Sequence, residues 1–165
     1  MLYNIYNPDD VRRIAAIRDK SVLNYASTKK MSVHSEVAGV AAELMFACTY
    51  GLPMNDTFLS KGDPGYDFFH NGYYIDCKAS TNARRLLIPV GKGKLSNIYV
   101  NYYVNPDTLF ALPLGWESGS VMACCPIHDF GQGPAHWKFS NELQPMWDLH
   151  EMLSKPAPHA GGEGD

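Results

Sequence analysis

The stretch that decides the fold is Gly62-Asp63-Pro64-Gly65-Tyr66-Asp67-Phe68-Phe69-His70-Asn71-Gly72-Tyr73-Tyr74-Ile75-Asp76-Cys77-Lys78-Ala79-Ser80. Asn71-Gly72 is typical of a two-residue β-hairpin turn, because both turn positions need positive φ. The pair lies between two aromatic and aliphatic runs, so the sequence predicts antiparallel strands over about 67–70 and 73–79. Counting outward from the turn places Asp67 directly opposite Asp76.

The predicted hairpin brings three charged side chains together. Directly opposed residues share a face with Cβ atoms roughly 4.5–5.5 Å apart, so two aspartates there repel unless a cation lies near them. The two-residue period of a strand puts Lys78 on the face of Asp76, while Cys77 points the other way. Carboxylate oxygens suit Mg²⁺ or Mn²⁺, and a neighbouring lysine can orient a water molecule or neutralise a phosphoryl oxygen.

The same charges also have a purely structural interpretation. An Asp/Glu-x-Lys triplet is expected about once in a chain of this length. On an exposed strand it would be a solvated pattern that protects a sheet edge. Asp67 favours the functional interpretation, since a turn with independently recognisable chemistry places it opposite Asp76.

Length and composition describe one globular domain. The 165 residues are 45% hydrophobic, 19% charged and 12% aromatic, and a chain of this size buries about 70% of its unfolded surface. A net charge of -3 excludes a bulk electrostatic affinity for nucleic acid, so such binding needs a local basic patch. We expect a single domain over 1–154 and a disordered tail over 155–165, because the end is rich in proline, alanine and glycine.

Hydropathy and cysteine usage bear on localisation. No apolar run approaches the length of a membrane span, and Met1–Arg13 lacks the features of a signal peptide. The four cysteines show no disulfide or CxxC spacing, and we expect them to be reduced. The sequence therefore predicts a soluble, cytoplasmic protein without membrane association.

Two helices are predicted before the hairpin. Asn7-Pro8-Asp9-Asp10 supplies a cap, a proline at the first helical position and acidic residues at the positive end of the dipole. This helix should run to about Ala26. A second helix should be capped by Ser32 and end at about Tyr50, with Gly51 as its left-handed stop.

Two glutamates of the second helix, Glu36 and Glu43, border its apolar stripe. Seven helical residues span about 10.5 Å, so both cannot touch one ion bound at the aspartates. We select Glu43 as the candidate ligand. Glu36 then supports the site from outside or forms a boundary salt bridge.

Further elements are predicted around the hairpin. Short strands are expected at Thr57–Ser60, Arg84–Val90, Ile98–Val104 and Leu109–Leu114, with a turn and another strand over 115–123. A last helix is expected over Asn141–Leu153, which Pro145 breaks or starts.

A basic segment follows the hairpin. From Cys77 through Pro106 there is no Asp or Glu. The segment contains five basic residues, Lys78, Arg84, Arg85, Lys92 and Lys94. Such segregation suits an enzyme that draws a polyanion to an acidic site, although the Gly-Lys-Gly-Lys loop is equally explained as a solubilising hairpin tip. Nearby aromatics are candidates for base stacking, but in strands they are more often core: Tyr99, Tyr102, Tyr103 and Trp116.

Residues Glu43, Asp67, Asp76, Cys77 and Lys78 together resemble the pattern of the PD-(D/E)XK nuclease superfamily, which includes Holliday-junction resolvases and many phage-encoded nucleases. In that family a glutamate-bearing helix precedes a β-hairpin with Asp and then Asp/Glu-x-Lys. Tyr66 stands here in place of the proline of the motif. The resemblance implies an α/β, restriction-endonuclease-like fold, with a central mixed β-sheet of four or more strands flanked by helices.

The resemblance also implies metal-dependent hydrolysis of phosphodiester bonds, in DNA more than RNA. Glu43, Asp67, Asp76 and the backbone carbonyl of Cys77 would hold one or two Mg²⁺ or Mn²⁺ ions, and Lys78 would orient water or stabilise developing charge. Flanking phosphates would be held by the remaining basic residues, Arg84, Arg85, Lys92 and Lys94. A homodimer would suit cleavage of two strands, and a phage-encoded enzyme would act in the host cytoplasm.

Other functions are compatible with parts of this pattern. One is a catalytically silent nucleic-acid-binding or scaffolding module on the same fold, which the presence of all four charged residues argues against. Another is a partner-binding protein whose charged face is merely surface. A metal-dependent phosphohydrolase acting on nucleotides is a third.

Overall fold

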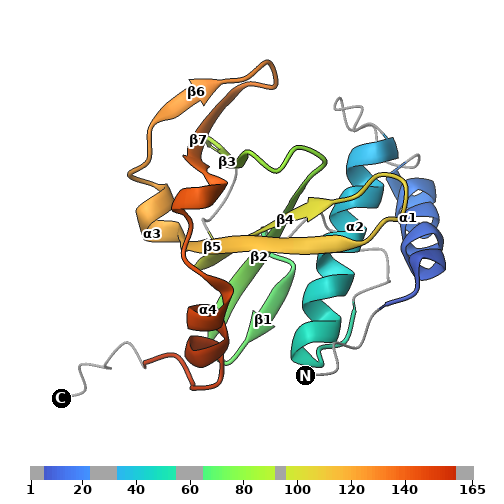
Figure 1. The fold of residues 1–165 in the computed structure, drawn as a ribbon, viewed down its shortest axis with the longest axis horizontal. Helices are drawn as coiled ribbons and strands as arrows, with labels where there is room; N and C mark the ends of the chain where they lie inside the picture. The colour runs from blue at the N-terminus through green and yellow to red at the C-terminus, as the bar shows by residue number, and fades with distance from the viewer. Residues whose placement is uncertain (1–5, 23–32, 55–64, 92–95, 159–165) are drawn as a thin grey trace.

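The computed structural model describes residues 6–22, 33–54, 65–91 and 96–158 (Figure 1). Its helices are α1 (Pro8–Val22), α2 (Val33–Tyr50), α3 (Gly119–Met122) and α4 (Met146–Leu153), with a 3₁₀ turn at Ser140–Glu142. Its strands are β1 (Phe68–His70), β2 (Tyr73–Ser80), β3 (Arg85–Pro89), β4 (Ile98–Val104), β5 (Ala111–Ser118), β6 (Ile127–Asp129) and β7 (Pro134–Phe139). The fold is mixed α/β.

The strands form two sheets. The central sheet has the order β1-β2-β4-β5, in which β2 and β4 are parallel and the other neighbours are antiparallel. The second sheet has the order β3-β7-β6 and is antiparallel throughout. The predicted mixed sheet of four strands is therefore confirmed.

The predicted starts and stops of the helices explain their observed ends. The side chain of Asn7 accepts a 2.9 Å hydrogen bond from the Asp9 N–H at the start of α1. Gly51, with φ of 64°, ends α2 in the left-handed conformation that glycine adopts without steric cost. The expected extension of α1 to Ala26 and the cap at Ser32 lie outside the described residues, as does the predicted strand at Thr57–Ser60.

The hairpin has the predicted register. Phe68 pairs with Ile75, Phe69 with Tyr74 and His70 with Tyr73. Asn71 and Gly72 both have positive φ, 49° and 89°, which is the conformation of a type I′ turn. The Asn71 carbonyl accepts a 2.7 Å hydrogen bond from the Ala157 N–H, so the described part of the C-terminal segment contacts this turn.

The two faces of the central sheet are covered by different layers. On one face, buried β2 and β4 side chains such as Ile75 and Val100 join a core with α1, α2 and α4. On the other, Tyr99 packs with Leu86 and Ile88 of β3 and with Met122 of α3. Helices therefore cover one face as expected, whereas mainly the second sheet covers the other.

The later strands agree only in part with the predictions. The strand expected at Arg84–Val90 is observed as β3, which pairs with β7 in the second sheet. The strand expected to end at Leu114 continues to Ser118 along β4 and is followed by the short helix α3, not by a turn and a strand. The second sheet also contains β6 and β7, which were not predicted.

The last helix is shorter than expected. It begins at Met146, with Pro145 at its N-cap, because a proline lacks the N–H that a helix interior requires. Among the helices that the model describes, none has the length and apolar character needed to cross a membrane.

Candidate functional site

Asp67 lies immediately before β1, at the edge of the central sheet. Its N–H donates a 2.9 Å hydrogen bond to the carbonyl of Ile75, the residue that pairs with Phe68, so Asp67 departs from the regular ladder and the predicted pairing of Asp67 with Asp76 is not observed. Its Oδ2 accepts a 2.7 Å hydrogen bond from the Cys77 N–H. Because β1 pairs with only the first residues of β2, the Asp67 side chain covers part of the β2 edge that β1 leaves unpaired.

Asp76 and Lys78 share a face of β2, as the strand period predicts. The Lys78 Nζ lies 2.8 Å from Asp76 Oδ2, and the side chains are 35% and 14% exposed, respectively. Burial opposes the charged form of Lys78, yet the attraction and hydrogen bond of Asp76 outweigh it and raise the lysine pKa. Lys78 is therefore a cation at neutral pH.

Glu43 reaches the site from α2 and is held by Arg18 of α1. Arg18 Nη1 donates to Oε1 at 2.9 Å and Nη2 donates to Oε2 at 2.7 Å, a bidentate pair. The hydrogen bond from Arg18 to Glu43 is the main reason that the arginine pKa is raised. Glu36 also attracts the Arg18 guanidinium, more weakly than Glu43 does.

The electrostatics of Asp67 show that the three carboxylates lie close together. Burial raises the pKa of Asp67 well above its usual range, and repulsion from Glu43 and Asp76 raises it further. Among the ion pairs formed by described residues, Glu43 pairs with Arg18 and Asp76 pairs with Lys78, whereas none involves Asp67. The negative charge of Asp67 is therefore disfavoured in the folded protein.

The donor set has the chemistry of a hard-cation site. Carboxylate oxygens are the ligands that Mg²⁺ and Mn²⁺ prefer, and the repulsion at Asp67 favours an added cation. Within the described ranges, however, no group of three or more His, Cys, Asp or Glu side chains is arranged to hold a metal ion. Glu43 and Asp76 instead contact Arg18 and Lys78, so a divalent cation would have to compete with these basic groups.

Cys77 serves the site through its backbone. Its side chain is buried in the core shared with the helices, on the opposite face from Asp76. Burial raises the pKa of the thiol well above its usual range, and repulsion from Asp67, Glu43 and Asp76 adds to this shift. The thiol is therefore protonated at neutral pH and is a poor soft-metal ligand.

Two of the predicted phosphate-binding residues lie at the start of the second sheet. Arg84 precedes β3 and is exposed, and Arg85 is the first residue of that strand in the second sheet. The Arg85 guanidinium lies 4.1 Å from the centre of the Phe130 ring. Lys92 and Lys94 lie outside the described residues.

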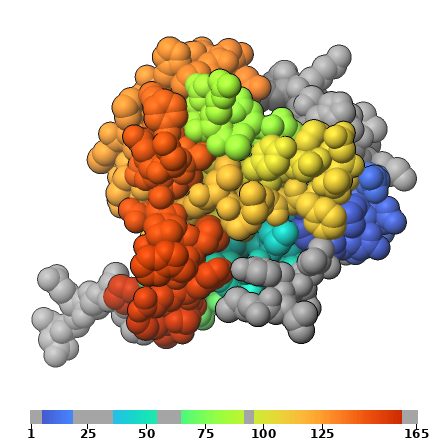
Figure 2. Space-filling view, viewed as in Figure 1, coloured from blue at the N-terminus to red at the C-terminus, as the bar shows by residue number. Residues whose placement is uncertain are grey.

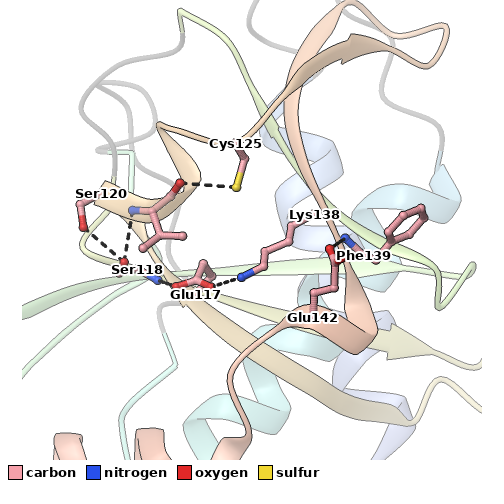
Figure 3. Close-up of polar contacts among 8 residues, drawn as sticks. Glu117, Ser118, Ser120, Cys125, Lys138, Phe139 and Glu142 are labelled. Carbon is pink, nitrogen blue, oxygen red and sulfur yellow. Dashed lines mark hydrogen bonds and ion pairs between the residues drawn. The ribbon is translucent and has the colours of Figure 1, made fainter.

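Two charged contacts were not foreseen from the sequence. Only the packing of α1 on α2 places Arg18 on Glu43, and no local pattern indicates this contact. Glu117 of β5 and Lys138 of β7 form a 2.6 Å ion pair with side chains 3% and 20% exposed, and the Ser118 N–H also donates to Glu117 (Figure 3). The sequence did not indicate the Glu117–Lys138 pair, because Lys138 lies on β7, a strand that was not predicted.

Glu117 belongs to the same face of the central sheet as the candidate site. The register pairs Asp76 with Tyr99 and Tyr99 with Glu117, so the three form one row across β2, β4 and β5. Adjacent strands are roughly 4.8 Å apart, so Tyr99 separates the two acidic residues by about two strand spacings. Glu117 and Lys138 therefore form a structural ion pair beside the carboxylate cluster.

Comparisons with models of protein families, with curated proteins and with solved structures found no match. The functional interpretation therefore rests on the residues and contacts of this chain: Glu43, Asp67, Asp76 and Lys78, brought together by α2 and the β1–β2 hairpin, with Arg18 added by α1.

Proposed function

We propose that this protein is a metal-dependent nuclease with a restriction-endonuclease-like fold that hydrolyses phosphodiester bonds, in DNA more than in RNA. The observation that carries the proposal is the cluster of Glu43, Asp67 and Asp76, in which burial and repulsion disfavour the ionised form of Asp67. A protein surface that needed no cation would gain stability by replacing Asp67.

The arrangement of elements supports the finer fold assignment. A glutamate-bearing helix, an Asp-bearing hairpin and an Asp-x-Lys strand follow one another in the chain, and α2 packs on a face of the mixed central sheet that contains the hairpin. These are the parts that the resemblance to PD-(D/E)XK nucleases requires.

The roles of the residues follow from their charge and position. Glu43, Asp67, Asp76 and the Cys77 carbonyl would hold Mg²⁺ or Mn²⁺, which supplies a bound water of lowered pKa and neutralises charge in the transition state. Lys78 is a cation at neutral pH, so it stabilises a phosphoryl oxygen or orients water and does not act as a general base.

A second candidate is a catalytically silent nucleic-acid-binding module on the same fold. The specific observation in its favour is that both Glu43 and Asp76 already have basic partners, Arg18 and Lys78. In that case the ion pairs would be the final state of the cluster, and no divalent cation would replace them.

The test is cleavage of a panel of linear, nicked, branched and single-stranded DNA, together with RNA, in Mg²⁺, in Mn²⁺ and in EDTA. Asp76→Asn is compared with Asp107→Asn, which makes the same chemical change at an exposed position after β4. Metal-dependent cutting that only Asp76→Asn loses would support the nuclease. Cutting that Asp76→Asn retains would contradict this site, and binding without cutting by the folded protein would favour the silent module.

A further inference from the structure

The second sheet carries a row of aromatic rings, which we call the aromatic ladder: His128, Phe130, Trp137 and Phe139. The ring centres of neighbours in this order are 4.5, 5.9 and 4.9 Å apart. The planes meet at 62°, 89° and 83°, so each ring meets the next edge to face. This geometry is favourable for aromatic rings and holds each one in a defined orientation.

The ladder lies on the outer face of the second sheet. On β7, Lys138 points inward to Glu117, so its neighbours Trp137 and Phe139 point outward; Figure 3 shows Lys138 and Phe139 extending in different directions from the strand. Phe130 and Phe139 remain 39% and 45% exposed. Strands β3 and β7 adjoin, and both segments reach the surface in the view of Figure 2.

Basic residues adjoin the ladder on β3. Arg85 pairs in register with Phe139 and places its guanidinium 4.1 Å from the centre of the Phe130 ring. Arg84, next to it, is exposed. The nearby carboxylates are already engaged with the backbone: Asp129 accepts from the Gly131 and Gly133 N–H groups, and Glu142 accepts from the Phe139 N–H.

We infer that the aromatic ladder with Arg84 and Arg85 binds single-stranded nucleic acid, with bases on the rings and phosphates on the arginines. Unpaired bases expose flat faces that stack on aromatic side chains, whereas duplex bases are already stacked on one another. An arginine beside the rings can bind a phosphate group, so the surface suits a partner that has both flat rings and negative charge and not one that is purely apolar. This inference rests on the proposed function, because it specifies which form of nucleic acid the nuclease recognises.

The position of the ladder relates it to the carboxylate cluster. The inner face of the same second sheet packs on Tyr99, whose register neighbour on the central sheet is Asp76. The chain passes from the end of β2, which carries the candidate site, to Arg85 within five residues. A short connection therefore joins the strand that carries Asp76 and Lys78 to the start of β3, where Arg85 adjoins the ladder.

The experiment measures binding by fluorescence anisotropy of labelled oligodeoxythymidylate, a duplex and an RNA strand, all in EDTA so that no cleavage occurs. Phe130→Leu and Phe139→Leu keep apolar bulk but remove the aromatic face, and Arg85→Gln removes the charge. Trp147→Leu is the matched control, since this ring is 67% exposed on α4, away from the ladder. Thermal unfolding of every variant verifies that it is folded.

We expect each ladder variant to weaken single-strand binding about five- to a hundredfold, as loss of one stacking ring does elsewhere, while Trp147→Leu binds normally and duplex binds more weakly throughout. Normal single-strand affinity in folded Phe130→Leu and Phe139→Leu would overturn the inference. So would equal losses for duplex and single strand, or a change in oligomeric state alone, which would make this face a protein interface.

The two proposals fail separately in these assays. Ladder-dependent binding by a protein that cuts nothing would reject the nuclease and leave the single-strand surface standing. Metal-dependent cutting, together with normal single-strand binding by the ladder variants, would support the nuclease and reject the single-strand surface.

Discussion

Arg18 binds the carboxylate of Glu43 with two hydrogen bonds of 2.9 and 2.7 Å, and this pair ties α1 to α2 beside the candidate site. The pair is only partly exposed, 24% for the arginine side chain and 13% for the glutamate. Its attraction is therefore less screened by solvent than that of a surface pair. Any divalent cation that uses Glu43 has to compete with this guanidinium.

Removing that competitor should strengthen metal binding. We expect Arg18→Gln to lower the dissociation constant for Mn²⁺ about tenfold, measured by isothermal titration calorimetry without nucleic acid, because a charge-assisted hydrogen bond of this kind contributes about 1.5–3 kcal/mol. Arg12→Gln is the control, since Arg12 pairs with Asp9 at the exposed start of α1. Weaker binding by Arg18→Gln would show instead that the arginine positions Glu43 for the metal.

The two glutamates of α2 should differ sharply in cleavage assays. Glu43→Gln should reduce the rate at least about a hundredfold, since it removes a charge next to Asp67, whereas residues outside a metal site cost about 10–100-fold at most. Glu36→Gln should stay within about tenfold of the unaltered protein. The opposite order of effects would assign the helix ligand to Glu36.

Asp67 should make the fold less stable as the pH rises. Its raised pKa means that the folded protein retains a proton that the unfolded chain loses near pH 3.9. The associated stability is fully present below that pH and is lost as the pH rises toward the native pKa. Asp67→Asn should therefore flatten the pH dependence of the melting temperature above pH 4. At neutral pH the melting temperature of this variant should be higher than that of the unaltered protein, by roughly 2–4 °C for each kcal/mol gained in the free energy of unfolding.

Calorimetric scans at several pH values would measure this effect. The Asp67→Asn variant keeps a side-chain oxygen for the Cys77 N–H that now donates to Asp67, so the hydrogen bond is not the variable. Asp107→Asn, at an exposed position, should leave the profile unchanged. A melting temperature of Asp67→Asn that falls at neutral pH would contradict the electrostatic strain on this carboxyl.

The Glu117–Lys138 pair should be important for stability. Lys138→Met leaves the almost fully buried Glu117 without its cation, and breaking a buried pair costs about 3 kcal/mol. Adding Glu117→Gln to that variant should recover part of the loss. Lys155→Met, in a pair more than 60% exposed on both sides, should change the free energy of unfolding by less than about 0.5 kcal/mol. Urea titrations give the free energy of unfolding of the unaltered protein, the two single lysine variants and the double variant. Equal losses for Lys138→Met and Lys155→Met would refute the role of burial.

Local chemistry explains why much of the site was predictable. The Asn71-Gly72 turn fixes the register of a two-residue hairpin, so the pairs from His70–Tyr73 to Phe68–Ile75 follow by counting. The predicted pairing of Asp67 with Asp76 is not observed, because β1 begins at Phe68 and the Asp67 N–H donates to the Ile75 carbonyl. The helix caps and Gly51 likewise act within a few residues of the ends that they define. The expectation that Tyr99 and Tyr102 belong to the core is confirmed, with exposures of 3% and 1%.

By itself, then, the sequence determined the hairpin turn and the two N-terminal helices, because each depends on neighbouring residues. Tertiary structure alone decided that Arg18 meets Glu43 across 25 positions of the chain, that β3 leaves the central sheet to pair with β7, and that four aromatic side chains form a ladder. These contacts join segments that are far apart in sequence. Burial and sheet pairing select the partner in each contact, and no local sequence pattern specifies which partner that is.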